Sequence, residues 1–108
     1  MAAATSKSDQ RTSFSNFGLT TVDVGAPGKI IWSTTAFGDY DTGVGTSFAC
    51  PHVTGAAALM LSVNPTLTVE ELRDRIMDNV DPVKDLAGIT VTGGRLNTFR
   101  AVSAALWP

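Results

Sequence analysis

The feature that most constrains this chain is a run of mostly apolar residues from Ser47 to Val63. On a helix these side chains would point to every side: Phe48, Ala49, Val53, Ala56, Ala57, Ala58, Leu59, Met60, Leu61 and Val63. A helix that is apolar all round is typical of the middle of a protein. Pro51 is compatible with a start near Ser47, because the first N–H groups of a helix have no intrahelical partner. Asn64-Pro65 is expected to end this central helix.

Two further helices are predicted downstream. Thr68 and Glu71 have the spacing of a capping box, in which each side chain satisfies a backbone N–H of the other residue. From Val69 to Val80 the apolar residues recur at helical spacing, which indicates an amphipathic surface helix. Asp81-Pro82 should close it, and a last helix is expected from Asn97 to Leu106.

The predicted strands are short. Residues 20–24 alternate as a strand does, and residues 25–28 carry the Gly and Pro of a sharp turn that should stop it. Residues 29–35 are rich in Ile, Trp and Thr, which favours a second strand. Residues 38–43 have the composition of a turn, and residues 89–92 are expected to form a last short strand.

The N-terminal residues show no targeting signal. Residues 1–4 lack the positive start and the apolar core of a secretory signal and are interpreted as an artificial boundary. Residues 5–18 are polar and without periodicity, which predicts a loop.

Composition limits the classes of function. A chain of 108 residues suffices for one domain, but only 17% of its residues are charged, against about 25% in a typical soluble domain, so much of it is expected to lie inside something larger. The net charge of −2 and the lack of a Lys/Arg cluster disfavour nucleic acid and membrane surfaces as partners. The longest apolar run, residues 56–61, is far shorter than the roughly 20 residues that cross a bilayer. The single Cys50 excludes an internal disulfide and is interpreted as a small buried hydrophobe.

Ser47 is the candidate nucleophile. It stands between a glycine-rich turn and the apolar helix, where unpaired N–H groups and the helix dipole favour negative charge on a substrate oxygen. Gly45 lacks a Cβ and would let a substrate backbone approach. On position alone, a serine at a helix start is more often a cap.

A longer motif resembles a known family. The string Gly45-Thr46-Ser47-Phe48-Ala49-Cys50-Pro51-His52-Val53-Thr54-Gly55 is similar to the serine signature of subtilisin-like serine proteases, the subtilases of peptidase family S8. Residues 13–18 and 22–28 resemble the two segments that precede that serine, and residues 94–97 resemble the usual C-terminal ending. The resemblance implies an α/β fold, the C-terminal part of the three-layer subtilisin fold, with residues 1–108 as one partial catalytic domain.

The resemblance also assigns roles. Ser47 would attack the scissile carbonyl and its backbone N–H would help to form the oxyanion hole, with Gly45, Thr46, Pro51 and His52 completing the motif. His52 is not the catalytic histidine of the family. Five residues along a helix give about 7.5 Å of rise and about 140° of rotation, too far to reach the Ser47 hydroxyl. We expect His52 to satisfy a buried polar contact, and no metal site, since no second His or Cys lies at ligand spacing.

The resemblance further implies that essential groups are missing. Subtilisin-like enzymes carry their triad in the order Asp, His, Ser, but only 46 residues precede Ser47 and none is His. The longer parent is therefore expected to be a secreted serine endopeptidase acting on polypeptides, and this chain alone to be inactive. No cofactor is expected here, although calcium is compatible with the parent, since Asp23 lies in a segment that borders a weak cation site in some relatives.

The sequence allows one alternative function and excludes another. The chain could be a non-catalytic interaction or scaffold fragment in which Ser47 only caps a helix. An esterase of the α/β-hydrolase fold is excluded, because that fold needs a His after the serine and none follows His52.

Exposed apolar faces are expected to make the isolated chain self-associate.

Overall fold

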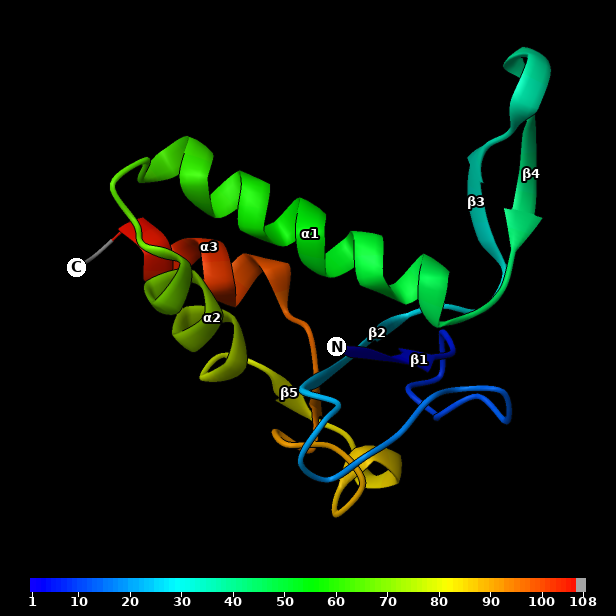
Figure 1. Cartoon of the computed structure of the whole chain (residues 1–108), viewed down its shortest axis with the longest axis horizontal. Helices are drawn as coiled ribbons and strands as arrows, with labels where there is room; N and C mark the ends of the chain where they lie inside the picture. The colour runs from blue at the N-terminus through cyan, green and yellow to red at the C-terminus, as the bar shows by residue number, and fades with distance from the viewer. Residues whose placement is uncertain (107–108) are drawn as a thin grey trace.

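The computed structural model describes residues 1–106, which form a small mixed sheet with three helices on one face (Figure 1). The sheet order is β1-β2-β6-β5. β1–β2 and β2–β6 are parallel and β5–β6 is antiparallel. The strands are β1 (Ala2–Thr5), β2 (Val24–Pro27), β5 (Asp81–Pro82) and β6 (Gly94–Arg95). This arrangement of strands and helices confirms the expected α/β class.

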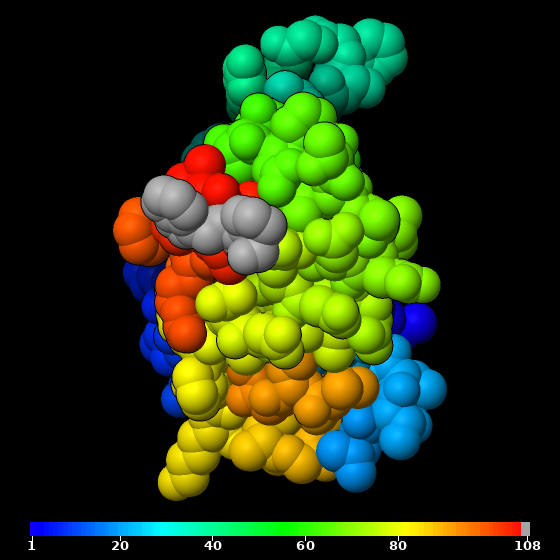
Figure 2. Space-filling model, turned by 90° about the vertical axis from the view of Figure 1, so that its left-hand side faces the viewer, coloured from blue at the N-terminus to red at the C-terminus, as the bar shows by residue number. Residues whose placement is uncertain are grey.

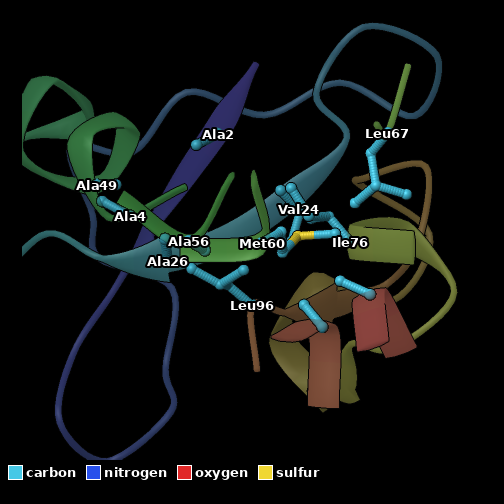
Figure 3. Packing of buried hydrophobic residues seen from close by; sticks show 12 residues of the cluster. Ala2, Ala4, Val24, Ala26, Ala49, Ala56, Met60, Leu67, Ile76 and Leu96 are labelled. Carbon is cyan, nitrogen blue, oxygen red and sulfur yellow. The ribbon is translucent and has the colours of Figure 1, made fainter. Parts of the chain in front are cut away.

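The helices cover the sheet through a core of small side chains. α1 (Thr46–Val63) packs on β1, β2 and α3 (Thr98–Leu106), and α2 (Val69–Met77) packs on α3. Figure 3 shows this cluster, whose buried members are Ala2, Ala4, Val24, Ala26, Ala49, Ala56, Met60, Leu67, Ile76, Leu96, Ala101 and Ala105. Alternate residues of a strand point to opposite faces, so Ala3 joins a second cluster with Val22, Val83 and Leu86 on the far side.

The central helix is confirmed, but much of it is uncovered. α1 begins at Thr46, one residue before the predicted start, and ends at Val63 as expected. Only Ala49, Ala56 and Met60 are buried, while Leu59, Leu61 and Val63 on other sides are exposed. α1 has 18 residues with a mean hydropathy of 1.2, values that a membrane-spanning helix shares with a core helix of a water-soluble protein. Because a helix that is apolar all round is typical of a protein interior, the sequence predicts that these exposed sides of α1 are covered by further protein.

The second helix has the predicted cap. Glu71 N–H donates to Thr68 Oγ1 (3.1 Å), and Thr68 N–H donates to Glu71 Oε1 (3.3 Å). These bonds, with the Arg75 guanidinium at 3.2 Å, hold the pKa of Glu71 below its usual value, the backbone N–H of Thr68 contributing most. Ile76 turns inward from α2 as the periodicity requires. The last helix, α3, begins at Thr98, one residue after the predicted start.

The first two strands differ from the prediction. Ala2–Thr5 is a buried strand, whereas the sequence predicted no regular element there and placed Thr5 in a loop. The strand predicted at residues 20–24 lies instead at Val24–Pro27, because pairing with β1 in the register Ala2↔Val24 draws the supposed turn into the sheet. Gly25 allows this, since a Cβ there would collide with the Leu86 side chain.

Three other predictions need correction. The strand predicted at residues 29–35 is present as β3 (Ile31–Thr34), but the supposed turn at residues 38–43 mostly forms its partner β4 (Tyr40–Gly43). Residues 89–92 form turns and bends, and the strand that follows them is β6. Asp81-Pro82 does follow α2, yet it forms β5, where Asp81 binds Arg95 of β6 (3.0 Å).

Candidate active site

Ser47 lies where α1 meets the carboxyl ends of the two parallel strands β1 and β2. Gly28, directly after β2, donates its N–H to Thr5 O at the end of β1 (3.0 Å). Gly45, directly before α1, donates its N–H to Gly28 O (2.8 Å). The start of the helix is thereby tied to both strand ends, the edge at which α/β sheets bind their ligands.

Two glycines make this close approach possible. Gly45 has φ 132° and ψ 167°, a conformation that favours glycine. Gly28 is buried, and a Cβ there would lie 2.6 Å from Ala4 Cβ and 2.7 Å from Gly45 O. Neither atom can move without displacing a strand or the turn before Ser47. Gly28 therefore fixes the position of the candidate nucleophile although it is 19 residues away in the sequence.

The Ser47 hydroxyl and the first N–H groups of α1 are free in the described part of the chain. Gly45 is the N-cap and makes no side-chain cap bond, while its carbonyl accepts from Phe48 N (3.0 Å) and Ala49 N (3.3 Å). Within residues 1–106, neither Ser47 Oγ nor the N–H groups of Thr46 and Ser47 have a hydrogen-bond partner. The exposed serine thus stands beside unpaired donors at the positive end of an 18-residue helix.

Thr46 has a partner that the sequence did not reveal. Asn16 Nδ2 donates to Thr46 Oγ1 (3.2 Å) across 30 residues. Asn16 lies in the segment 13–18 that the resemblance singled out, so its neighbourhood was marked although its role was not. The bond links the loop after β1 to the residue that precedes Ser47.

His52 is bound to its own helix. Its Nδ1 lies 2.9 Å from Phe48 O, and the ring is partly buried. The partner of this polar contact is a main-chain carbonyl, and the contact is partly buried where a buried one was expected. Pro51 stays inside α1, five residues after the helix begins. No side chain among residues 1–106 hydrogen-bonds to Ser47 Oγ, so the described chain presents the serine without a base.

Cys50 is exposed, which contradicts its interpretation as a buried residue. It lies on α1 beside a mainly apolar hollow of about 390 Å³ that α1, α2 and the N-terminal end of β1 enclose. The apolar composition of α1 led us to expect a cover on this side, but Cys50 faces the hollow. Within the described residues, no three His, Cys, Asp or Glu side chains lie together in a metal-binding arrangement.

Comparison with known proteins gives the same family throughout. A family model described as the Subtilase family matches residues 1–100. Subtilisin NAT of Bacillus subtilis subsp. natto is 52% identical over 73 residues, 68% of this chain and 19% of that protein. Thermitase of Thermoactinomyces vulgaris is 37% identical over 100 residues, 93% of this chain and 34% of thermitase.

Solved structures agree with this result. The A-subunit of the AB5 toxin from E. coli matches with a TM-score of 0.80 and 34% identity over 86% of this chain and 30% of that one. A chain from the subtilase cytotoxin SubAB assembly matches with a TM-score of 0.85 and 30% identity over 97% of this chain and 36% of that one. The chain thus spans about a fifth to a third of the relatives it matches. With a family model matched over nearly its whole length, this chain belongs to the subtilase family of serine peptidases.

Proposed function

We propose that Ser47 is the nucleophile of a subtilisin-like serine endopeptidase of which this chain is a part. The observation that carries the proposal is the free Ser47 hydroxyl beside the unpaired N–H groups at the start of α1. Ser47 Oγ would attack the scissile carbonyl carbon and give its proton to a base outside this chain. The Ser47 N–H and the positive helix end would stabilise the oxygen that gains negative charge, and an acyl-enzyme would form on Ser47.

The isolated chain is proposed to be inactive. A serine hydroxyl is a poor nucleophile near neutral pH unless a base takes its proton. The chain has one histidine, His52, and its Nδ1 is directed at Phe48 O within the helix. Residues 1–108 would then be one part of a single catalytic domain, with the triad Asp and His supplied by another part.

The competing hypothesis is an interaction or scaffold fragment in which Ser47 is only a helix cap. The cap geometry favours the catalytic proposal, because Gly45 occupies the N-cap position and the Ser47 side chain bonds to no backbone N–H of α1. A serine that neither caps the helix nor binds another described side chain is available for chemistry.

A chimaera tests the nucleophile directly. Subtilisin E of Bacillus subtilis is 52% identical to this chain over 73 residues, and those residues would be replaced by the ones from this chain. The purified chimaera is treated with a fluorophosphonate and its intact mass is measured beside a Ser47→Ala control. We expect one adduct that Ser47→Ala abolishes. A chimaera that is folded by circular dichroism and gains no mass would contradict the role of Ser47.

The remaining assignments follow from membership of the family. The substrate of the longer protein is a polypeptide, and its site of action is proposed to be extracellular. No nucleic acid or membrane partner and no cofactor is proposed for this chain. Calcium remains compatible with the parent, but the single carboxylate of Asp23 is far from the six to eight oxygens that calcium takes. The exposed apolar surface is proposed to make the isolated chain self-associate.

A further inference from the structure

The segment before Ser47 gives the start of α1 little support. Val44 and Gly45 join α1 to the hairpin of β3 and β4, which extends beyond the first turn of α1 (Figure 1). Figure 2 shows this hairpin standing above the packed helices. Among residues 1–106, its two strands pair with each other and with no other strand. The position of the nucleophile in this chain therefore depends on contacts made by the turn itself.

The backbone of Gly45 cannot fix this turn by its own stiffness. Glycine has more conformational freedom than any other residue, and Gly45 uses it at φ 132° and ψ 167°. Its N–H bond to Gly28 O (2.8 Å) restrains the turn at one residue. Thr46 lies between Gly45 and Ser47, so a second restraint at Thr46 would determine how the nucleophile is presented.

Asn16 supplies a restraint at Thr46. Its Nδ2 donates to Thr46 Oγ1 (3.2 Å), and an amide nitrogen can only donate, so the hydroxyl oxygen is the acceptor. Threonine is branched at Cβ and has a stiff χ1, so holding Oγ1 also holds the Thr46 backbone. The peptide bond from Thr46 to Ser47 is planar, so the Ser47 N–H is oriented with it.

Asn16 is itself held on both sides by its own loop. The buried Ser15 Oγ accepts from Ala4 N of β1 (2.8 Å) and donates to Asn16 O (2.9 Å). Arg11 Nη1 donates to Ser15 O (3.3 Å), and the Arg11 guanidinium lies 5.0 Å from the centre of the Phe17 ring. Because the loop is already ordered, the exposed bond from Asn16 costs little further conformational entropy.

Together these contacts form a continuous path from the sheet to the nucleophile. It runs from Ala4 in β1 through the loop to Asn16, and from Asn16 to Thr46. The bond at Gly45 ties the preceding residue to the end of β2. Two consecutive residues before Ser47 are thus restrained from two neighbouring strands, and every contact lies within residues 1–106.

We propose that Asn16 is a positioning residue for the nucleophile. It acts through Thr46 and keeps the Ser47 hydroxyl and the Ser47 N–H in the orientation that the reaction needs. This role rests on the proposed function of Ser47 and adds a residue to it. Loss of the Asn16 bond should slow the reaction at Ser47 while leaving the binding of substrate unchanged.

A chimaera that contains a complete catalytic domain tests this role. Thermitase of Thermoactinomyces vulgaris is aligned over 100 of the 108 residues, so the aligned stretch includes Asn16, Thr46 and Ser47. Those residues of thermitase would be replaced by the ones from this chain. The rest of the domain is then present in every variant and acts on all of them alike. The readouts are kcat and KM for a peptide p-nitroanilide and the rate of Ser47 modification by a fluorophosphonate.

Asn16→Ala should lower kcat and the rate of modification by about two- to tenfold, the worth of one hydrogen bond. KM should not change, because the bond contributes to the transition state and not to the binding of substrate. Asn79→Ala is the matched control, since Asn79 Nδ2 donates to Arg75 O (2.7 Å) beside α2 and makes no contact with the turn before Ser47. It should leave kcat unchanged.

A double-mutant cycle tests whether Asn16 acts through Thr46. Thr46→Val keeps the shape of the side chain and removes the acceptor. In a chimaera that already carries Thr46→Val, the further change Asn16→Ala should have no effect on kcat, because the bond is already lost. A further fall in kcat would overturn the action through Thr46.

The hydrogen bond can also be tested in the full chain without any catalysis. Three-bond NMR couplings from Thr46 Cγ2 to the backbone nitrogen and carbonyl carbon report the χ1 rotamer. We expect a single rotamer in the unaltered chain and averaging over rotamers in Asn16→Ala. Averaging in the unaltered chain, or a single rotamer in both proteins, would overturn the restraint by Asn16.

The outcomes separate this role from the proposed function. A folded chimaera without a Ser47-dependent adduct would contradict the proposed function, and the role of Asn16 would fall with it. A chimaera that reacts at Ser47 with a kcat insensitive to Asn16→Ala would overturn only the role of Asn16. An equal fall in kcat for Asn79→Ala would also overturn it, because the effect would then be a general loss of stability.

Discussion

Replacing Gly28 by alanine should destabilise the fold at the point that positions Ser47. The added Cβ would lie 2.6 Å from Ala4 Cβ and 2.7 Å from Gly45 O, so β1 or the turn before α1 must shift. Overpacking of this kind costs about 1–3 kcal/mol. Gly55 provides the matched control, since it lies inside α1 and no atom is within 4 Å of the position of its Cβ. The same change there should stabilise the chain by about 1 kcal/mol, because alanine is the better helix former.

Urea unfolding followed by circular dichroism measures both effects. The two variants should differ by about 2–4 kcal/mol in the free energy of unfolding, which separates their midpoints by about 1 M or more. If Gly28→Ala unfolded at the midpoint of the unaltered chain, the space at Gly28 would not be as tight as the contacts with Ala4 and Gly45 indicate. If Gly55→Ala destabilised the chain, the space around Gly55 would be occupied.

Three further predictions concern the helices. Thr68→Ala removes the cap of α2 and should cost about 1 kcal/mol in urea unfolding. Because folding lowers the pKa of Glu71, the stability that its carboxylate contributes is present above its unfolded pKa and is lost as the pH falls through its folded pKa. If urea unfolding showed the same stability above and below this acidic range, the hydrogen bonding between Glu71 and Thr68 would be contradicted. Met60→Ala leaves a cavity at a fully buried position and should lower the free energy of unfolding by about 2–5 kcal/mol. Leu59→Ala, at the exposed neighbouring position, should change it by under about 1 kcal/mol. Similar losses for both variants would show that the outer side of α1 is covered. Cys50 should react with a thiol reagent in the native chain at a rate close to that in urea, and a thiol protected until unfolding would contradict its exposure.

The helices could be predicted because their signals are local. The capping box of Thr68 and Glu71 and the apolar spacing after it lie within a few turns of chain, and α1 is marked by its composition. The strands have only two to four residues, too few for a periodic signal. Residues 25–27 have the composition of a turn and become a strand only because β1 and β6 lie beside them.

The site was predicted only in part for the same reason. The string around Ser47 marked the candidate nucleophile, but the contacts of Asn16 with Thr46 and of Gly28 with Gly45 join residues 30 and 17 positions apart. Such contacts appear only once the strands have placed their loops together. The error at Cys50 arose because apolar surroundings in the sequence were taken to mean burial.

We propose that this chain carries the nucleophile of a protease without the base that activates it. The most direct test is the intact mass of the purified, folded chain after exposure to a fluorophosphonate, with Ser47→Ala as the control. We expect no adduct on either protein. An adduct that Ser47→Ala abolishes would contradict it, because a base within this chain or a second copy of it would then be activating Ser47.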